Sequence, residues 1–184
     1  MSIIEDVFNP IYGKPCWQFQ QGYGSFLTLE FGEPHLYIRE PRQASEQASD
    51  KVRKNFARRL VVVHGDWHLW VYLCDWRIFS HEQLIADNNS KRRGIKQATS
   101  EFDGQALVRV TVNESFISVF EFDLGGRLEA IPNTEAYETT SDLWLLYEPS
   151  GYVFTLRADG KHSHTPGNAP TDEEKWQPLI INGA

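Results

Sequence analysis

Short alternating stretches of apolar and polar residues, broken by glycine and proline, constrain the fold of this 184-residue chain more than any other feature. The first region, KPCWQFQQGYGSFLTLEFGEPHLYIREP, is typical of three short strands separated by tight turns. In its middle strand Leu27, Leu29 and Phe31 share one face, because side chains alternate along a strand. We therefore expect a fold dominated by strands that turn one apolar face inward.

A similar pattern recurs later in the chain. GQALVRVTVNESFISVFEFDLGGRLEAIP, residues 104–132, matches the first region at a shift of 91 residues, which pairs Glu30 with Glu121. RLVVVHGDWHLWVYL and DLWLLYEPSGYVFTL, which end at Leu73 and Leu156, match without gaps at a shift of 83. The difference between the shifts places an insertion in the first copy, and insertions belong in surface loops. The sequence therefore predicts an internal repeat.

We predict a single domain over residues 1–184, because this length can bury one good core and does not demand a second. The predicted class is α+β, mainly β, with two similar five-stranded repeats that form a sandwich or barrel-like sheet and one or two connecting helices. The expected organisation is repeat one at 13–81 with an insertion at 42–59, a connector at 82–103, repeat two at 104–164 and a docking tail at 165–184.

Helices are expected in the insertion and in the connector. Val52 and Phe56 lie four residues apart, which favours a short helix in the insertion. Ser80 and Gln83 could form a capping box, and the spacing of Ile95, Ala98 and Phe102 is helical. The connector is therefore predicted to be helical.

Charge is distributed unevenly along the chain. The net charge of −7 argues against general nucleic-acid binding, which needs a basic surface. The stretch from Arg39 to Arg59 holds seven Lys or Arg and three acids, so it carries +4 and the remainder carries −11. Such polarity favours an oriented encounter with another macromolecule, and a solvated basic face is the alternative.

We expect a cytoplasmic protein with no membrane segment. The longest apolar runs have the length of strands, and the opening MSIIEDVFNP lacks the basic and apolar regions of a secretory signal. In a reducing compartment, Cys16 and Cys74 should be buried thiols that pack in the core.

Histidines form the one candidate metal constellation. His64 and His68 flank a tight turn, and His162 and His164 would share one strand face, so imidazoles could converge on a metal ion if these segments meet. No Cys-x-x-Cys or His-Glu-x-x-His motif accompanies them, and exposed turn histidines are the simpler interpretation.

Catalytic patterns are weak. Glu30 and Glu121 could form an acid–base pair if a twofold axis relates the repeats, but each lies opposite the more apolar strand face, where solvent exposure is expected. GYGSF at residues 22–26 matches neither a nucleophile elbow nor a dinucleotide loop. We assign no catalytic residue, expect no cofactor and favour a protein that is not an enzyme.

Aromatic residues suggest a contact surface, because Trp and Tyr are preferred anchors at protein interfaces. Core packing is the alternative for each Trp. The candidate interface consists of Trp67, Trp70, Tyr72 and Trp76, with Arg53 and Arg58 from the basic insertion.

FEFDLGGRLEAIP, followed by DLWLLYEPSGYVFTLRADGKHSHTPG, resembles a family of small uncharacterised bacterial proteins with Phe-Asp-x-Gly-Gly, Trp-x-Leu, Pro-x-Gly and Asp-Gly motifs. These motifs occupy turns and core positions, so the resemblance implies a fold and no reaction. In size, acidity and strand content the chain is also similar to immunity proteins of bacterial toxin systems.

The leading hypothesis is a non-enzymatic protein-binding domain, of the inhibitor or immunity type, that uses the Trp67 to Trp76 hairpin and the basic insertion. The alternative is a small-ligand or metal-binding domain with a pocket between the repeats. A hydrolase of unknown substrate is third. The sequence leaves the partner and the oligomeric state open.

Overall fold

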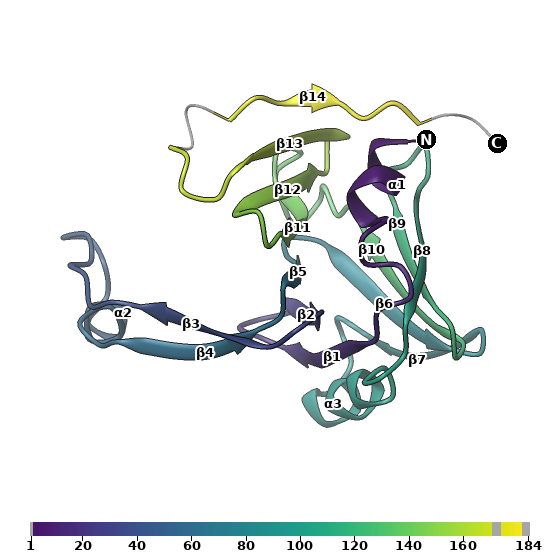
Figure 1. Cartoon of the computed structure of the whole chain (residues 1–184), viewed down its shortest axis with the longest axis horizontal. Coiled ribbons are helices and arrows are strands. Elements are labelled where there is room, and N and C mark those ends of the chain that lie inside the picture. Colours follow the sequence, from purple (N-terminus) through teal and green to yellow (C-terminus); the bar gives the residue numbers. More distant parts are fainter. Residues whose placement is uncertain (1, 171–173, 182–184) are drawn as a thin grey trace.

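The computed structural model describes residues 2–170 and 174–181 of the chain. Within these residues, fourteen strands form antiparallel sheets of seven, five and two strands, accompanied by three short helices (Figure 1). The predicted α+β, mainly β class is confirmed. The sheets of the described residues do not close into a barrel, and no helix among them is long and apolar enough to span a membrane.

The larger sheet has the strand order β1-β2-β5-β11-β12-β13-β14. Its early strands are β1 (Cys16–Gln21), β2 (Leu27–Phe31) and β5 (Trp67–Val71). Its late strands are β11 (Asp142–Tyr147), β12 (Tyr152–Arg157), β13 (Lys161–Pro166) and β14 (Gln177–Pro178). Strands from the two halves of the sequence therefore meet where β5 pairs with β11.

The five-stranded sheet has the order β7-β6-β10-β9-β8. Its strands are β6 (Asp75–Ser80), β7 (Gln83–Asp87), β8 (Leu107–Val112), β9 (Ser118–Phe122) and β10 (Gly126–Ile131). The two sheets share one hydrophobic core. Trp144 of β11 packs edge-on against Phe120 of β9, and its indole N–H donates to the Ser118 hydroxyl at 2.8 Å. Burial of these aromatic rings holds the sheets together.

Two helices pack on this body. α1 (Ile3–Phe8) has a Ser2 capping box at its N-terminus, and its Phe8 packs in the core against Trp144. α3 (Arg92–Ser100) buries Ile95 and Ala98, as its spacing predicts. The predicted helix start at Ser80 and Gln83 is wrong.

Strand β7, which begins at Gln83, takes the place of the predicted helix start and pairs with β6. The capping pattern reflects only a local preference for a helix. Here the pairing of β7 with β6, which also buries Ala86, outweighs that preference.

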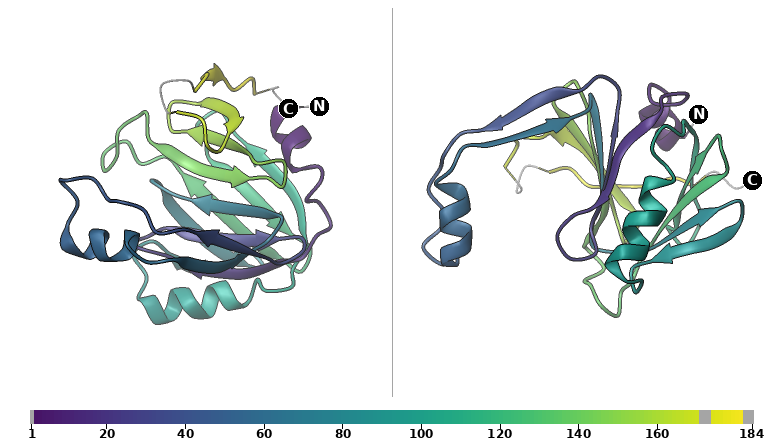
Figure 2. Two further views of the ribbon diagram at one scale, coloured as in Figure 1. Left: turned by 60° about the vertical axis from the view of Figure 1, so that its left-hand side comes forward. Right: turned by 90° about the horizontal axis from the view of Figure 1, so that it is seen from below.

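The remaining sheet is a projecting hairpin of β3 (His35–Arg39) and β4 (Leu60–His64), with α2 (Asp50–Phe56) near its tip (Figures 1 and 2). We call residues 35–64 the arm. The predicted helix in the insertion is confirmed, and the Ser49 side chain caps it by accepting from Val52 N–H. Figure 2 shows the arm extending away from the two large sheets.

The predicted pair of five-stranded sheets does not form. The shift of 91 carries the bounds of β1 and β2 onto those of β8 and β9, and both pairs are antiparallel hairpins. Pairing then diverges, because β3 pairs with β4 alone whereas β10 pairs with β6 and β9. The internal repeat remains a prediction.

The described part of the tail contacts the seven-stranded sheet, and both cysteines are buried as expected. β14 pairs with β13, and Leu179 is buried; residues 171–173 and 182–184 of the predicted docking tail lie outside the described residues. Burial raises the pKa of both Cys16 and Cys74 to about 12, so both are protonated core thiols.

Candidate metal centre

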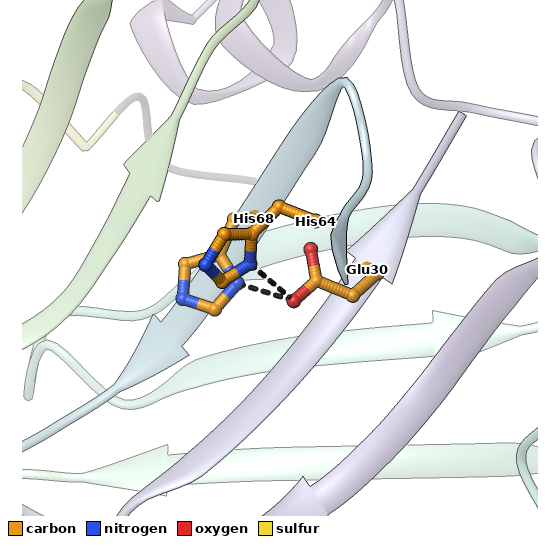
Figure 3. A group of neighbouring side chains, drawn as sticks. All are labelled: Glu30, His64 and His68. Atoms are coloured by element: carbon orange, nitrogen blue, oxygen red, sulfur yellow. Dashed lines mark hydrogen bonds and ion pairs between the residues drawn. The ribbon is translucent and has the colours of Figure 1, made fainter. Parts of the chain in front are cut away.

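Glu30, His64 and His68 converge where the arm joins the seven-stranded sheet (Figure 3). Glu30 lies on β2 and His68 lies directly opposite it on the neighbouring strand β5. His64 is the last residue of β4 and reaches the same point through the tight turn that leads into β5. Two parts of the chain, strand β2 and the turn from β4 into β5, thus supply one cluster.

A single carboxylate oxygen organises the two imidazoles. Glu30 Oε1 lies 2.9 Å from His64 Nδ1 and 2.7 Å from His68 Nδ1, and the ring centroids are 4.5 Å apart. An ionised carboxylate only accepts, so each Nδ1 donates its proton to this oxygen. Each ring then turns its other nitrogen, Nε2, away from Glu30 (Figure 3). Whenever a ring is neutral, this arrangement selects the tautomer whose Nε2 atom carries a free lone pair.

Gly65 makes the close approach possible. A Cβ atom at this position would collide with the backbone of Phe31, so only glycine allows the turn to lie against the end of β2. In this position the Gly65 N–H donates to Glu30 Oε2 at 2.9 Å. Asp66 holds the turn from its other side by accepting from Glu33 N–H at 2.9 Å. The turn therefore fixes both histidines and the second carboxylate oxygen.

Glu30 is 2% exposed, so its predicted solvent exposure is wrong. Alternation correctly assigns it to the face opposite Leu27 and Leu29, but the His64–Gly65 turn at the root of the arm covers that face. Glu121 lies on β9 in the other sheet, 3.8 Å from Arg109. The predicted acid–base pair of Glu30 and Glu121 does not form.

Opposing effects set the ionisation of Glu30. Burial raises the pKa of this carboxyl, but hydrogen bonds and charge from His68, together with the bonds from Gly65 and His64, outweigh burial and leave the pKa below its ordinary value. Glu30 is therefore a buried carboxylate that stays ionised at neutral pH. A buried charge of this kind requires the partners that surround it.

Two histidines and a glutamate form a ligand set used by catalytic zinc sites, which keep a further position open. One donor atom from each residue lies within 4.8 Å of the other two, and no fourth His, Cys, Asp or Glu of the described residues joins the group. Bonds of about 2.0–2.2 Å place tetrahedral ligands about 3.3 Å apart. The Oε1–Nδ1 separations of 2.9 and 2.7 Å would therefore widen only slightly around an ion bound by these atoms.

Two cavities border the histidines and Trp70. One, of about 530 Å³, is also lined by Gln18, Tyr23 and Phe26. Gln18 sits at an irregularity in the pairing of β1, with a left-handed φ of 49°, a conformation often found beside functional sites.

The other cavity, of about 500 Å³, is lined by residues from both halves of the sequence, including Tyr37, Asp66 and Tyr147. Burial, followed by the Asp142 charge, raises the pKa of Tyr147, so its phenol remains a hydrogen-bond donor there. Both volumes lie in the range of small-molecule sites.

The second histidine pair lies elsewhere. His162 and His164 are on β13, which β11 and β12 separate from β5. His164 Nε2 is 2.9 Å from Glu148 Oε1, whereas the His162 ring stacks on Phe154, and its Nδ1 has no hydrogen-bond partner among the described residues. Burial, and then the charge of His164, lowers the pKa of His162. The structure does not bring this pair together with His64 and His68.

The predicted interface residues are also dispersed. Trp76 is fully buried on β6 in the other sheet, so it packs in the core and cannot be a contact residue. Half-buried Trp70 and Tyr72 pack with Phe26, and half-buried Trp67 lies under the Lys14 ammonium at 5.3 Å. Arg53 and Arg58 are exposed near the tip of the arm.

No protein-family model, curated protein or solved structure matches this chain significantly. The resemblance to small bacterial proteins and to immunity proteins therefore remains a prediction, and functional argument rests on the site itself. Sequence reasoning proposed His64 and His68 as ligands but missed Glu30 as their partner. The available signal was one glutamate inside the apolar strand LTLEF, directly before a turn.

Proposed function

We propose that this protein binds a divalent transition-metal ion through Glu30, His64 and His68. The observation that carries this proposal is one buried carboxylate oxygen shared by two imidazole nitrogens at 2.9 and 2.7 Å. Imidazole suits Zn²⁺, Cu²⁺, Ni²⁺ and iron, whereas Mg²⁺ and Ca²⁺ prefer oxygen ligands. Zn²⁺ is the first choice, because it accepts three protein ligands and keeps a fourth position for water or a ligand.

Glu30 has a defined role whether the histidines bind the ion through their Nε2 atoms or through their Nδ1 atoms. If the two Nε2 atoms bind the ion, Glu30 orients both rings from behind, as carboxylates do for zinc-bound histidines. If the Nδ1 atoms bind, Oε1 becomes the third ligand. In both modes the carboxylate compensates the charge of the ion, and the adjoining cavities give a small ligand access to the histidines.

The competing interpretation is an ion pair that only stabilises the root of the arm. A zinc titration separates the two. Tag-free protein treated with chelator should take up one Zn²⁺ per chain in isothermal titration calorimetry. The double variant His64→Ala/His68→Ala should lose this binding, while the matched variant His162→Ala/His164→Ala should retain it.

Circular dichroism establishes that each variant is folded before its titration is interpreted. Absence of Zn²⁺ uptake by the folded wild type, or equal loss in both double variants, would contradict the proposal. The third hypothesis, a hydrolase, gains a candidate metal but no assigned reaction.

Protein binding is the second candidate function. The observation that favours it is the exposed apolar surface of the arm.

A further inference from the structure

The arm presents an apolar face to solvent. Leu36 pairs with Val63 and Ile38 pairs with Val61, so these four side chains project from the same face of the two-stranded sheet. Their exposed fractions are 63%, 38%, 51% and 51% respectively. Grouped exposed apolar side chains of this kind mark interaction surfaces in soluble proteins.

The arm also has little support of its own. Among the described residues, β3 and β4 hydrogen-bond only to each other as strands. A two-stranded hairpin is at best marginally stable in water unless another element covers it. We therefore expect another protein surface to pack on the exposed apolar face of the arm.

Charge identifies the complementary surface. The segment from Arg39 to Arg59 carries +4 and the rest of the chain carries −11. Lys51 and Lys54 are exposed on α2 near the tip of the arm, so two arms repel each other, whereas an arm and an acidic body attract. Each copy of the chain supplies one basic arm and one acidic body.

We infer that the arm docks on the body of a second copy of this chain, and that the second arm docks reciprocally on the first body. Reciprocal docking closes a twofold dimer and leaves no arm uncovered. Interfaces of ordinary size use about 20–30 residues on each side. Residues 35–64 supply a segment of that length. This inference is independent of the metal proposal.

Sedimentation equilibrium of the full chain tests the inference. The expected species has twice the 21.2 kDa mass of one chain, and it dissociates more readily in 1 M salt, where the Debye length falls to about 3 Å. Two variants, Leu36→Ser/Ile38→Ser and Lys51→Glu/Lys54→Glu, should each raise the dissociation constant at least about tenfold. All four side chains are exposed, so the fold should tolerate both changes.

The matched control is Lys51→Arg/Lys54→Arg, which changes the same two exposed side chains of α2 but keeps both positive charges. It should leave the dimer intact. In a mixture of ¹⁴N- and ¹⁵N-labelled chains, Lys51 or Lys54 should form mixed-isotope cross-links to lysines outside the arm.

A monomer at concentrations up to about 100 µM would overturn the inference, even if the arm binds a different acidic protein. A dimer that resists both arm variants would also overturn it. So would a dimer weakened equally by Lys51→Arg/Lys54→Arg, or cross-links confined to arm-to-arm pairs.

Discussion

The two histidine pairs of this chain look alike in sequence and differ in structure. His64 and His68 stand at the two ends of a turn, yet both rings reach the same oxygen of Glu30. His162 and His164 share one strand, and among the described residues only His164 reaches a carboxylate, that of Glu148. A spacing that brings two imidazoles onto one face therefore does not by itself create a site.

The two carboxylates explain the difference. Glu30 is 2% exposed and also accepts from the Gly65 backbone, so its charge is held by three donors away from water. The Glu148 side chain is 17% exposed and its partner His164 is 40% exposed. Electrostatic interactions strengthen where water is excluded, and exposed ion pairs contribute little. The buried arrangement can organise a metal ion, whereas the pair of Glu148 and His164 is a partly exposed contact.

The largest expected effect is on stability when each carboxylate is removed. Glu30→Ala leaves the Gly65 N–H and two histidines without their acceptor and should lower the free energy of unfolding by about 3–5 kcal/mol at pH 7. Glu148→Ala removes a partly exposed contact and should cost less than about 1 kcal/mol. Urea denaturation of metal-free protein measures the free energy of unfolding of both variants. Equal losses of stability would contradict the distinction between the buried and the partly exposed carboxylate.

The pH dependence of stability supplies a control for the comparison of wild type with Glu30→Ala. The folded-state pKa of Glu30 lies below its ordinary value, which is about 4.3 when unfolded. Its stabilising contribution is therefore complete above that value and is lost as the pH falls through the folded-state pKa. The stability difference between wild type and Glu30→Ala should narrow below about pH 4.

The second prediction compares two tight turns, one from β4 into β5 and one from β11 into β12. Gly65→Ala places a Cβ against the backbone of Phe31 and should cost about 2–3 kcal/mol by displacing the turn that holds both histidines. Gly151, in the turn between β11 and β12, has a φ of +81° but open space around it. Gly151→Ala should therefore cost only about 1 kcal/mol from backbone strain, as thermal unfolding would show. A larger loss of stability for Gly151→Ala than for Gly65→Ala would contradict the proposed difference between the two turns.

The third prediction concerns metal affinity. Glu30→Gln keeps the size of the side chain but removes its charge, and loss of such a partner typically weakens metal binding about 10–100-fold. Glu148→Gln should leave the dissociation constant of Zn²⁺ unchanged within about twofold. Glu148 lines the 500 Å³ cavity, but its carboxylate bonds to His164 and Ser150 and is not part of the group formed by Glu30, His64 and His68. Competition with a chromogenic chelator measures both values. Equal weakening by the two variants would place the ion elsewhere.

The smallest expected effect is the pH response of His162. Its folded-state pKa lies below the unfolded value of about 6.5, because burial disfavours the charged ring. The unfolded chain then binds the proton more readily, so this residue contributes stability above that pH that is lost as the pH falls toward its folded-state pKa. His162→Phe should make unfolding less sensitive to pH between 7 and 5. An unchanged slope would show that His162 is freely solvated.

Alternation and turn residues predicted the strands around Glu30 correctly, but not its environment. Alternation assigns residues to faces and does not say what covers each face. Glu30 and His68 are neighbours only because the chain returns after the whole arm to pair β5 with β2. The same limit applies to Trp76, which the sequence grouped with Trp70 although the two residues lie in different sheets.

Anomalous diffraction at the zinc edge, from crystals grown with one equivalent of Zn²⁺, tests the central claim most directly. The account predicts one strong peak about 2.0–2.1 Å from a ring nitrogen of both His64 and His68, with Glu30 either bound to the ion or hydrogen-bonded to both rings. No peak at this cluster, or a peak only at His162 and His164, would contradict it.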